Sequence, residues 1–179
     1  FVQLSICVIG DKNPISYDFG ISVIKNVLKA AETLKNNPKD LMARGVILYS
    51  ASISTSDWLG LGRKEEDHYS FDLYQIEYIP EQLFGSSYRE SLTALFPRFL
   101  KAAAKYHEND VRLYFHDVFD WNGTIDESVD MLIKYISGFG IDMFFEGELT
   151  QGKIDQVPEI FKTSLSKNEI YSLIKESMK

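Results

Sequence analysis

The stretch VQLSICVI, Val2 to Ile9, decides the fold class that the sequence predicts. Its residues are almost all apolar or β-branched and turn formers follow from Gly10 to Pro14, which is typical of a short buried strand. From Asp18 to Asn36, apolar residues recur every three or four positions and predict an amphipathic helix. A second apolar and β-branched run, Arg44 to Ser54, predicts another strand. The first unit is therefore predicted as strand, helix, strand.

The rest of the chain continues this alternation. Strands are predicted at Tyr69–Ile79, Val111–Phe115 and Ile141–Phe145, and helices at Tyr88–Tyr106, Asp126–Ser137 and Lys167–Met178. We therefore predict a single α/β or α+β domain over residues 1–179. Its core would be a mixed sheet of about five strands flanked by four to five helices. Residues 160–179 are predicted to form a C-terminal helical segment.

The acidic residues are concentrated in one region. Residues 106–160 contain twelve carboxylates against three cations, Arg112, Lys134 and Lys153, while the whole chain has a net charge of −7. Charge gathered on one part of a surface attracts a basic partner or holds a hard cation. The acidity also argues against nucleic acid as a partner, because nucleic-acid-binding proteins normally need a basic stripe to neutralise phosphates.

The sequence gives no sign of a membrane span or an internal disulfide. No apolar run approaches the roughly 20 residues that a membrane-spanning helix needs, so no membrane partner is expected. The single cysteine, Cys7, lies in an apolar run and cannot pair within the chain. We expect a cytoplasmic location. The chain begins at Phe1 rather than methionine, so a signal peptide removed from a longer precursor would change that expectation.

The segment VFDWNGTI, Val118 to Ile125, resembles the nucleophile loop of the haloacid dehalogenase superfamily of phosphohydrolases. In that family a strand leads to Asp-x-Asp-Gly-Thr, and the first aspartate attacks phosphorus. The resemblance implies that Asp120 is the nucleophile and that Thr124 helps to bind phosphate. Asn122 departs from the pattern, since it stands where the family has its acid/base aspartate. A metal-assisted phosphate-ester hydrolase that forms an aspartyl-phosphate is therefore the alternative function.

The same segment also has a purely structural interpretation. Asp120 to Gly123 is typical of a tight turn in which the glycine supplies a positive φ. Thr124 or Asp126 would then cap the following helix. This interpretation explains every residue of the motif without any catalysis.

Side chains able to bind a divalent cation follow two of the predicted strands: His116, Asp117 and Asp120 follow one, and Glu146 and Glu148 follow the other. Neighbouring strands would bring these oxygen and imidazole ligands together. However, the chain contains none of the recognised metal-ligand spacings. We therefore assign no metal ligand and no cofactor.

Between binding and hydrolysis, the sequence favours binding. Aromatic side chains among carboxylates give a protein interface both anchors and electrostatic steering, although acidic runs are equally typical of a solvated surface. We predict a non-catalytic protein whose acidic region, residues 106–160, contacts a basic protein partner. An inhibitor or immunity protein that neutralises a toxin or nuclease would work in this way. The predicted contact residues are Asp117, Asp120, Trp121, Asp126, Glu127, Glu146 and Glu148.

Overall fold

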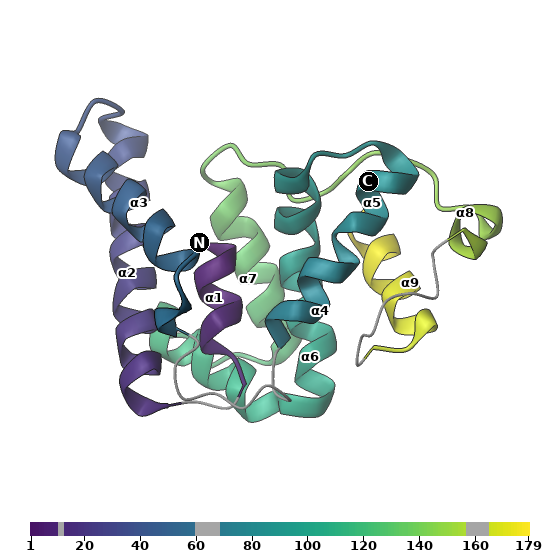
Figure 1. Ribbon diagram of the computed structural model, residues 1–179, viewed down its shortest axis with the longest axis horizontal. Helices are drawn as coiled ribbons and strands as arrows, with labels where there is room; N and C mark the ends of the chain where they lie inside the picture. Colours follow the sequence, from purple (N-terminus) through teal and green to yellow (C-terminus); the bar gives the residue numbers. More distant parts are fainter. Residues whose placement is uncertain (11–12, 60–68, 157–164) are drawn as a thin grey trace. The chain divides into compact units, whose positions relative to one another are not determined.

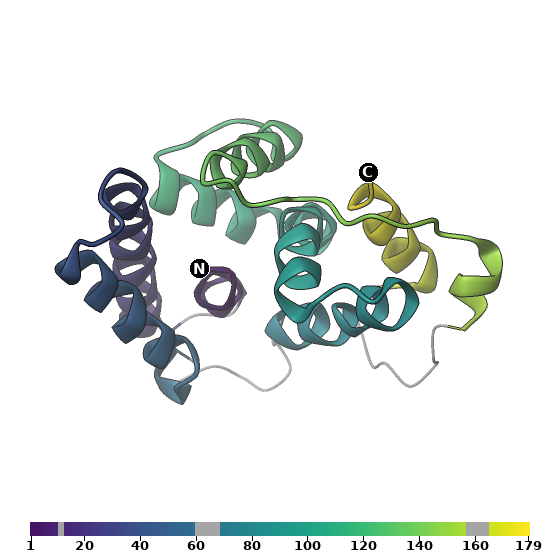
Figure 2. The ribbon, with the colours of Figure 1, turned by 90° about the horizontal axis from the view of Figure 1, so that it is seen from above.

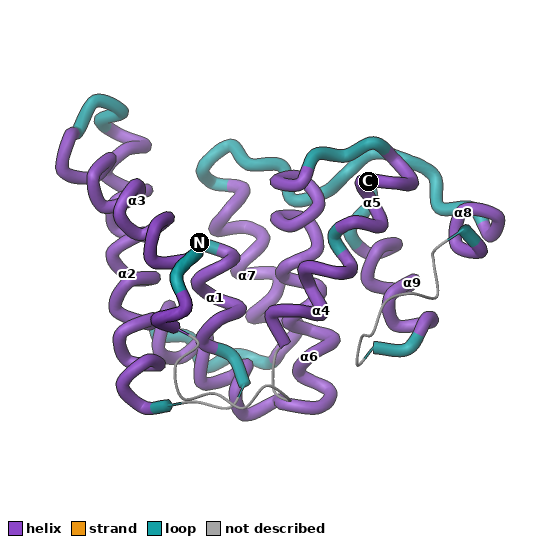
Figure 3. Tube along the Cα trace, viewed as in Figure 1, coloured by secondary structure: helices purple, strands orange, loops and turns teal. Residues whose placement is uncertain are grey.

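The computed structural model describes residues 1–10, 13–59, 69–156 and 165–179, and in these parts the chain forms helices joined by loops (Figure 1 and Figure 3). The helices are α1 (Val2–Val8), α2 (Pro14–Asn36), α3 (Leu41–Ser54), the 3₁₀ helix η1 (Asp57–Leu59), α4 (Tyr69–Ile76), α5 (Tyr78–Phe84), α6 (Tyr88–Phe119), α7 (Ile125–Ser137), α8 (Gln151–Asp155) and α9 (Lys167–Glu176). None of the described helices is long and apolar enough to cross a membrane.

The predicted mixed sheet, and with it the α/β class, is wrong for the described residues. Four of the predicted strands lie in helices: Val2–Ile9 at α1, Arg44–Ser54 in α3, Tyr69–Ile79 in α4 and α5, and Val111–Phe115 in α6. The fifth, Ile141–Phe145, is a loop with one isolated parallel bridge from Phe145 to Met178. Most of α1 is buried, and a short apolar run buried on all sides has the same pattern in a helix as in a strand.

The predicted helices are confirmed. They are Asp18–Asn36 within α2, Tyr88–Tyr106 within α6, Asp126–Ser137 within α7, and most of Lys167–Met178 as α9. Each carries apolar residues at helical spacing over several turns, which is the strongest sequence signal for a helix. Of the predicted C-terminal segment 160–179, residues 165–179 are described and contain α9, whereas residues 160–164 lie outside the described parts of the chain.

The chain divides into two compact units, each of which is described by itself. Unit 1 comprises residues 1–69 and 110–122, and unit 2 comprises residues 70–109 and 123–179. Helix α6 belongs to both, and its helical geometry is interrupted at His107, where φ is −142° and ψ is 46°. The single domain predicted over residues 1–179 stays a prediction.

In unit 1, α2 packs against both α1 and α3 (Figure 2). The closest approach of α1 and α2 is at Gly20, where a Cβ atom would overlap Cγ1 of Val8. Helix α3, in contrast, leaves much of its apolar sequence in solvent: Leu48 is 74% exposed and Tyr49 is 69% exposed. An apolar residue is therefore no guarantee of burial, which is a second reason why the prediction of a buried strand here was wrong.

The end of α6 completes the core of unit 1. Tyr114 is fully buried, and its hydroxyl donates a hydrogen bond of 2.8 Å to Ser5 Oγ in α1. The rings of Phe115 and Phe119 pack edge-on against the Tyr114 ring. Residues separated by more than a hundred positions in sequence thus form one core.

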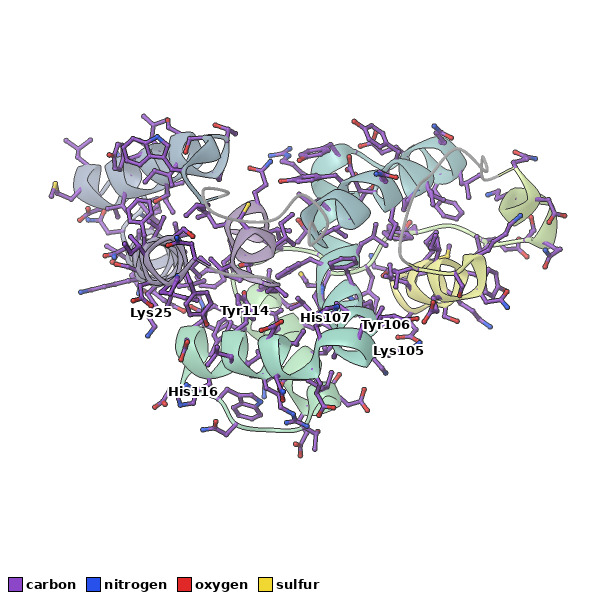
Figure 4. All side chains as sticks on the ribbon, turned by 60° about the horizontal axis from the view of Figure 1, so that its bottom comes forward. Lys25, Lys105, Tyr106, His107, Tyr114 and His116 are labelled. Atoms are coloured by element: carbon purple, nitrogen blue, oxygen red, sulfur yellow. The ribbon has the colours of Figure 1, made fainter. Side chains whose placement is uncertain are left out.

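Two helices of unit 2 begin with capping boxes. Thr124 and Glu127 form a capping box at the start of α7, and Ser166 and Glu169 form another at the start of α9. Glu169 also accepts hydrogen bonds from Lys105 Nζ and the Tyr106 hydroxyl of α6, at 3.2 and 3.1 Å; Figure 4 labels both residues. These bonds connect the start of α9 to α6.

The close approach of α1 and α2 predicts opposite effects for two glycine substitutions. Gly20→Ala should destabilise the protein by about 1–3 kcal/mol, because the added methyl group meets the stiff, β-branched Val8. Gly45→Ala in α3 is the matched control and should stabilise by about 0.5–1 kcal/mol, because a Cβ there enters open space. Urea unfolding of both variants measures the difference in their free energies of unfolding. An equal gain in stability in the two variants would contradict the close approach of α1 and α2 at Gly20.

Candidate functional site

A groove of about 490 Å³ lies between α2 and the end of α6, within unit 1. It is lined by Tyr17, Asp18, Ile21, Ser22, Lys25, Asn26 and Asp117. The N-cap residue Asn13 accepts the backbone N–H of Ile15 at 3.0 Å, which fixes the first turn of α2 that carries Tyr17. Figure 4 labels Lys25 on α2 and His116 on α6.

Asp117 is held by hydrogen bonds to both of its carboxylate oxygens. The Tyr17 hydroxyl donates to Oδ2 at 2.7 Å, and His116 Nδ1 lies 2.8 Å from Oδ1. Partial burial raises the pKa of this carboxyl group, but the hydrogen bonds from His116 and Tyr17, with the charges of His116 and Lys25, together hold the pKa below its ordinary value. Asp117 is therefore a fixed anion at neutral pH.

Tyr17 is affected in the opposite direction. Burial, the hydrogen bond to Asp117 and the negative charges of Asp117, Asp110 and Asp18 all raise the pKa of the Tyr17 hydroxyl. The hydroxyl therefore keeps its proton and remains a hydrogen-bond donor to Asp117. Because Tyr17 comes from α2 and Asp117 from α6, this bond also joins the two helices that line the groove.

Helix α6 ends at Phe119 and is followed directly by Asp120. This residue adopts a left-handed conformation with φ of 54°, and its backbone N–H donates to the His116 carbonyl at 2.8 Å. The arrangement is the left-handed cap that commonly ends helices, and aspartate tolerates it better than most residues. The positive φ predicted for Gly123 is thus found at Asp120 instead. Of the two predicted caps of the next helix, Thr124 and Asp126, the structure has Thr124.

The dehalogenase resemblance has a different structural setting in this protein. That family's motif follows a strand, but Val111–Phe115 belongs to α6, so a helix leads into Asp120. The Asp120 side chain is exposed beside the half-buried Trp121. The hydrolase alternative stays a prediction. The role of Asp120 at the end of α6 explains this residue without catalysis.

The predicted contact residues fall into both units. Asp117, Asp120 and Trp121 belong to unit 1, whereas Asp126, Glu127, Glu146 and Glu148 belong to unit 2. Three of the unit 2 carboxylates are already engaged: Asp126 pairs with Lys101 at 2.8 Å, Glu127 accepts bonds from Thr124, and Glu146 lies 3.3 Å from Lys179. Of the predicted contact residues, Asp117 lines the groove, and Asp120 and Trp121 follow it at the end of α6.

The side chains that were considered as metal ligands and not assigned are not grouped in the described parts of the chain. Across residues 1–10, 13–59, 69–156 and 165–179, no three His, Cys, Asp or Glu side chains are grouped closely enough to hold a metal ion. His116 and Asp117 are adjacent, but they hydrogen-bond to each other. No chemical step through a metal is therefore derived for this site.

Two buried charged residues were missed in the sequence. Arg98 is 4% exposed and Glu77 is 1% exposed. Burial and then the charge of Glu81 raise the pKa of Glu77 to about 7. Each of these two glutamates has a buried side-chain oxygen that makes no hydrogen bond within the described parts of the chain. The sequence could have revealed such a residue as a charged side chain within an apolar helical run, as in Phe96-Pro97-Arg98-Phe99.

Comparison with known proteins identifies a fold but no family. No family model matches the chain, and no curated protein matches it significantly. Among solved structures, an iron-containing alcohol dehydrogenase from Corynebacterium glutamicum superimposes with a TM-score of 0.63 and 14% sequence identity, over 98% of this chain and 50% of that chain. The chain thus spans about half the length of that dehydrogenase. The likeness supports the helical fold alone.

The hydrogen bonds to Asp117 predict a specific pKa change. Tyr17→Phe removes one donor, so the pKa of Asp117 should rise toward its ordinary value of about 3.9, measured by carbon-13 NMR titration of the carboxyl group. The pKa of Asp117 is lower in the folded state than in the unfolded state, so ionised Asp117 stabilises the fold above about pH 4. This stabilisation is lost as the pH falls through the pKa of Asp117 in the folded state. Tyr49→Phe, at an exposed residue of α3, is the control and should leave the titration unchanged. An unchanged titration in Tyr17→Phe would contradict the role of this bond.

Proposed function

We propose that this protein is a binding module and that the end of α6 contacts a basic protein partner. The observation that carries the proposal is the geometry of Asp117, whose charge is fixed by Tyr17 and His116 beside an open groove. Asp120 adds a second, exposed carboxylate one turn further along the chain. Together they offer a cationic side chain two negative charges in a defined position.

The position of these carboxylates supports a functional role. The carbonyl groups at a helix C-terminus carry partial negative charge, so each carboxylate placed there typically costs about 0.3–1 kcal/mol of stability. Helix α6 nevertheless has Asp117 in its last turn and Asp120 directly after it, with His116 as the basic residue of that turn. Sequences that accept a local cost of this kind often do so at functional sites.

The site has the components that a protein interface needs. An ionised carboxylate offers about four lone-pair positions, and Asp117 uses one on each oxygen for the bonds from Tyr17 and His116. A lysine or arginine of the partner can therefore bind to the same oxygens without displacing either donor. Trp121 is half-buried beside Asp120 and supplies an aromatic anchor.

The unit 2 carboxylates contribute less to the proposal. Lys101 already neutralises Asp126, and Lys179 lies close to both Asp142 and Glu146. Contact is therefore assigned to Asp117, Asp120 and Trp121. A basic toxin or nuclease, inhibited by carboxylates that occupy the place of phosphate, is the partner class that we propose.

Binding of an arginine-rich peptide to the full chain tests this assignment by isothermal titration calorimetry. Asp117→Asn and Asp120→Asn should each weaken binding by about tenfold or more, equivalent to about 1.4 kcal/mol. Glu32→Gln, at an exposed position of α2, removes the same charge elsewhere in unit 1 and should change the affinity by less than about threefold.

The control separates a defined site from general acidity. Equal losses in all three variants would show that only net charge matters and would contradict the proposed contact. Circular dichroism and thermal unfolding verify that each variant is folded, which matters most for Asp117 because it bonds to Tyr17. Asp120→Asn tests the site independently, since asparagine also tolerates the left-handed conformation.

A further inference from the structure

A second pocket, of about 380 Å³, lies in unit 2 and has no lining residue in common with the groove of unit 1. Its walls come from α6, α7, the end of α9 and the loop that contains Phe144. Val129 and Ile133 of α7 line it together with the Phe144 ring, so part of the wall is apolar. Its volume lies within the usual range of small-molecule sites, roughly 300–1,000 Å³.

Arg98 is the buried charge of this pocket. It is 4% exposed, its Nη1 donates to the carbonyls of Ala94 and Met143 at 3.1 and 2.8 Å, and its guanidinium carbon lies 4.3 Å from the centre of the Phe144 ring. Its other N–H groups make no hydrogen bond to the described residues, and no described carboxylate lies within ion-pair distance. Burial lowers the pKa of Arg98, and the negative charges of Glu176 and Asp130 partly offset this lowering. A largely buried cation that lines a pocket is stabilised further when an anion binds beside it.

The remaining charges of the pocket are of both signs. Lys101 and Asp126 pair with each other at 2.8 Å and so are largely neutralised. Asp130 and Glu176 are exposed, line the same pocket and interact electrostatically with Arg98 from beyond ion-pair distance. Lys134 is a further cation of the lining. An anion would be attracted by Arg98 and Lys134 and repelled by these carboxylates.

We propose that this pocket binds a small zwitterion of the α-amino-acid class with an apolar side chain. The ligand's carboxylate accepts hydrogen bonds from those N–H groups of Arg98 that bond to no described residue, in the forked geometry that guanidinium groups favour. Its ammonium group is attracted by Asp130 and Glu176, and its side chain packs on Val129, Ile133 and Phe144. A ligand with only one of the two charges would leave either the buried cation or the carboxylate pair without a partner.

Calorimetric titration of the full chain with L-leucine and two analogues tests the proposal. 4-Methylpentanoate lacks only the ammonium group, and 3-methylbutylamine lacks only the carboxylate. Leucine should bind about tenfold more tightly than either analogue, the ratio expected for one favourable charged contact. A first screen of the common L-amino acids by thermal unfolding identifies a better apolar side chain if one exists.

Variants then locate the binding. Glu176→Gln and Asp130→Asn replace exposed side chains and should retain the fold. Each should weaken the binding of leucine about fivefold to tenfold. The affinity for 4-methylpentanoate should stay unchanged or increase. Glu148→Gln is the matched control, since Glu148 is exposed in unit 2 and does not line the pocket, and it should have no effect. Arg98→Lys should abolish binding of leucine and of 4-methylpentanoate alike. Because Arg98 also bonds to two backbone carbonyls, this variant is interpreted only if its thermal unfolding remains cooperative.

Three results would overturn the proposal. The first is the absence of binding by every amino acid at millimolar concentration. The second is binding of 4-methylpentanoate as tight as that of leucine, which would indicate a simple carboxylate site. The third is equal loss in Glu176→Gln and Glu148→Gln, which would place the ligand outside this pocket.

Discussion

The hydrogen bonds that join the end of α6 to the first helices are the contacts on which unit 1 depends. Tyr114 donates to Ser5 in the buried core, and Tyr17 donates to Asp117 at the groove. Each bond connects residues about a hundred positions apart, so the last turns of α6 are fixed by α1 and α2 rather than by their neighbours in sequence. The groove, the charge state of Asp117 and the exposed position of Asp120 all follow from this placement.

The two units present different electrostatic surroundings to a ligand. In unit 1 the carboxylates of Asp117 and Asp120 are held near a helix C-terminus, where the backbone adds to their negative potential. In unit 2 lysines from outside the acidic region, such as Lys101 and Lys179, neutralise neighbouring carboxylates. The strong local acidity of the sequence is therefore divided between the site that we propose for a basic partner and a pocket with charges of both signs.

The sequence predicted the long amphipathic helices and the cap at Thr124, because these depend on local spacing and on one side chain bonding to its own backbone. It did not distinguish α1 from a buried strand, since an all-apolar run has no period to measure. Asp117 was identified from its charge, but its partner Tyr17 was not, because only the fold brings α2 to α6. Arg98 was missed for a similar reason: its burial depends on Met143 and Phe144, which lie far along the chain.

The most direct test of the account is to map the surface that contacts a basic partner, by following backbone amide shifts of the full chain by NMR as an arginine-rich peptide is added. The account predicts that the largest shifts lie in Tyr17–Asn26 and His116–Asn122, the two segments that surround the groove and end α6. Shifts of equal size spread over the exposed carboxylates of both units, or confined to Asp142–Glu148 in unit 2, would contradict it.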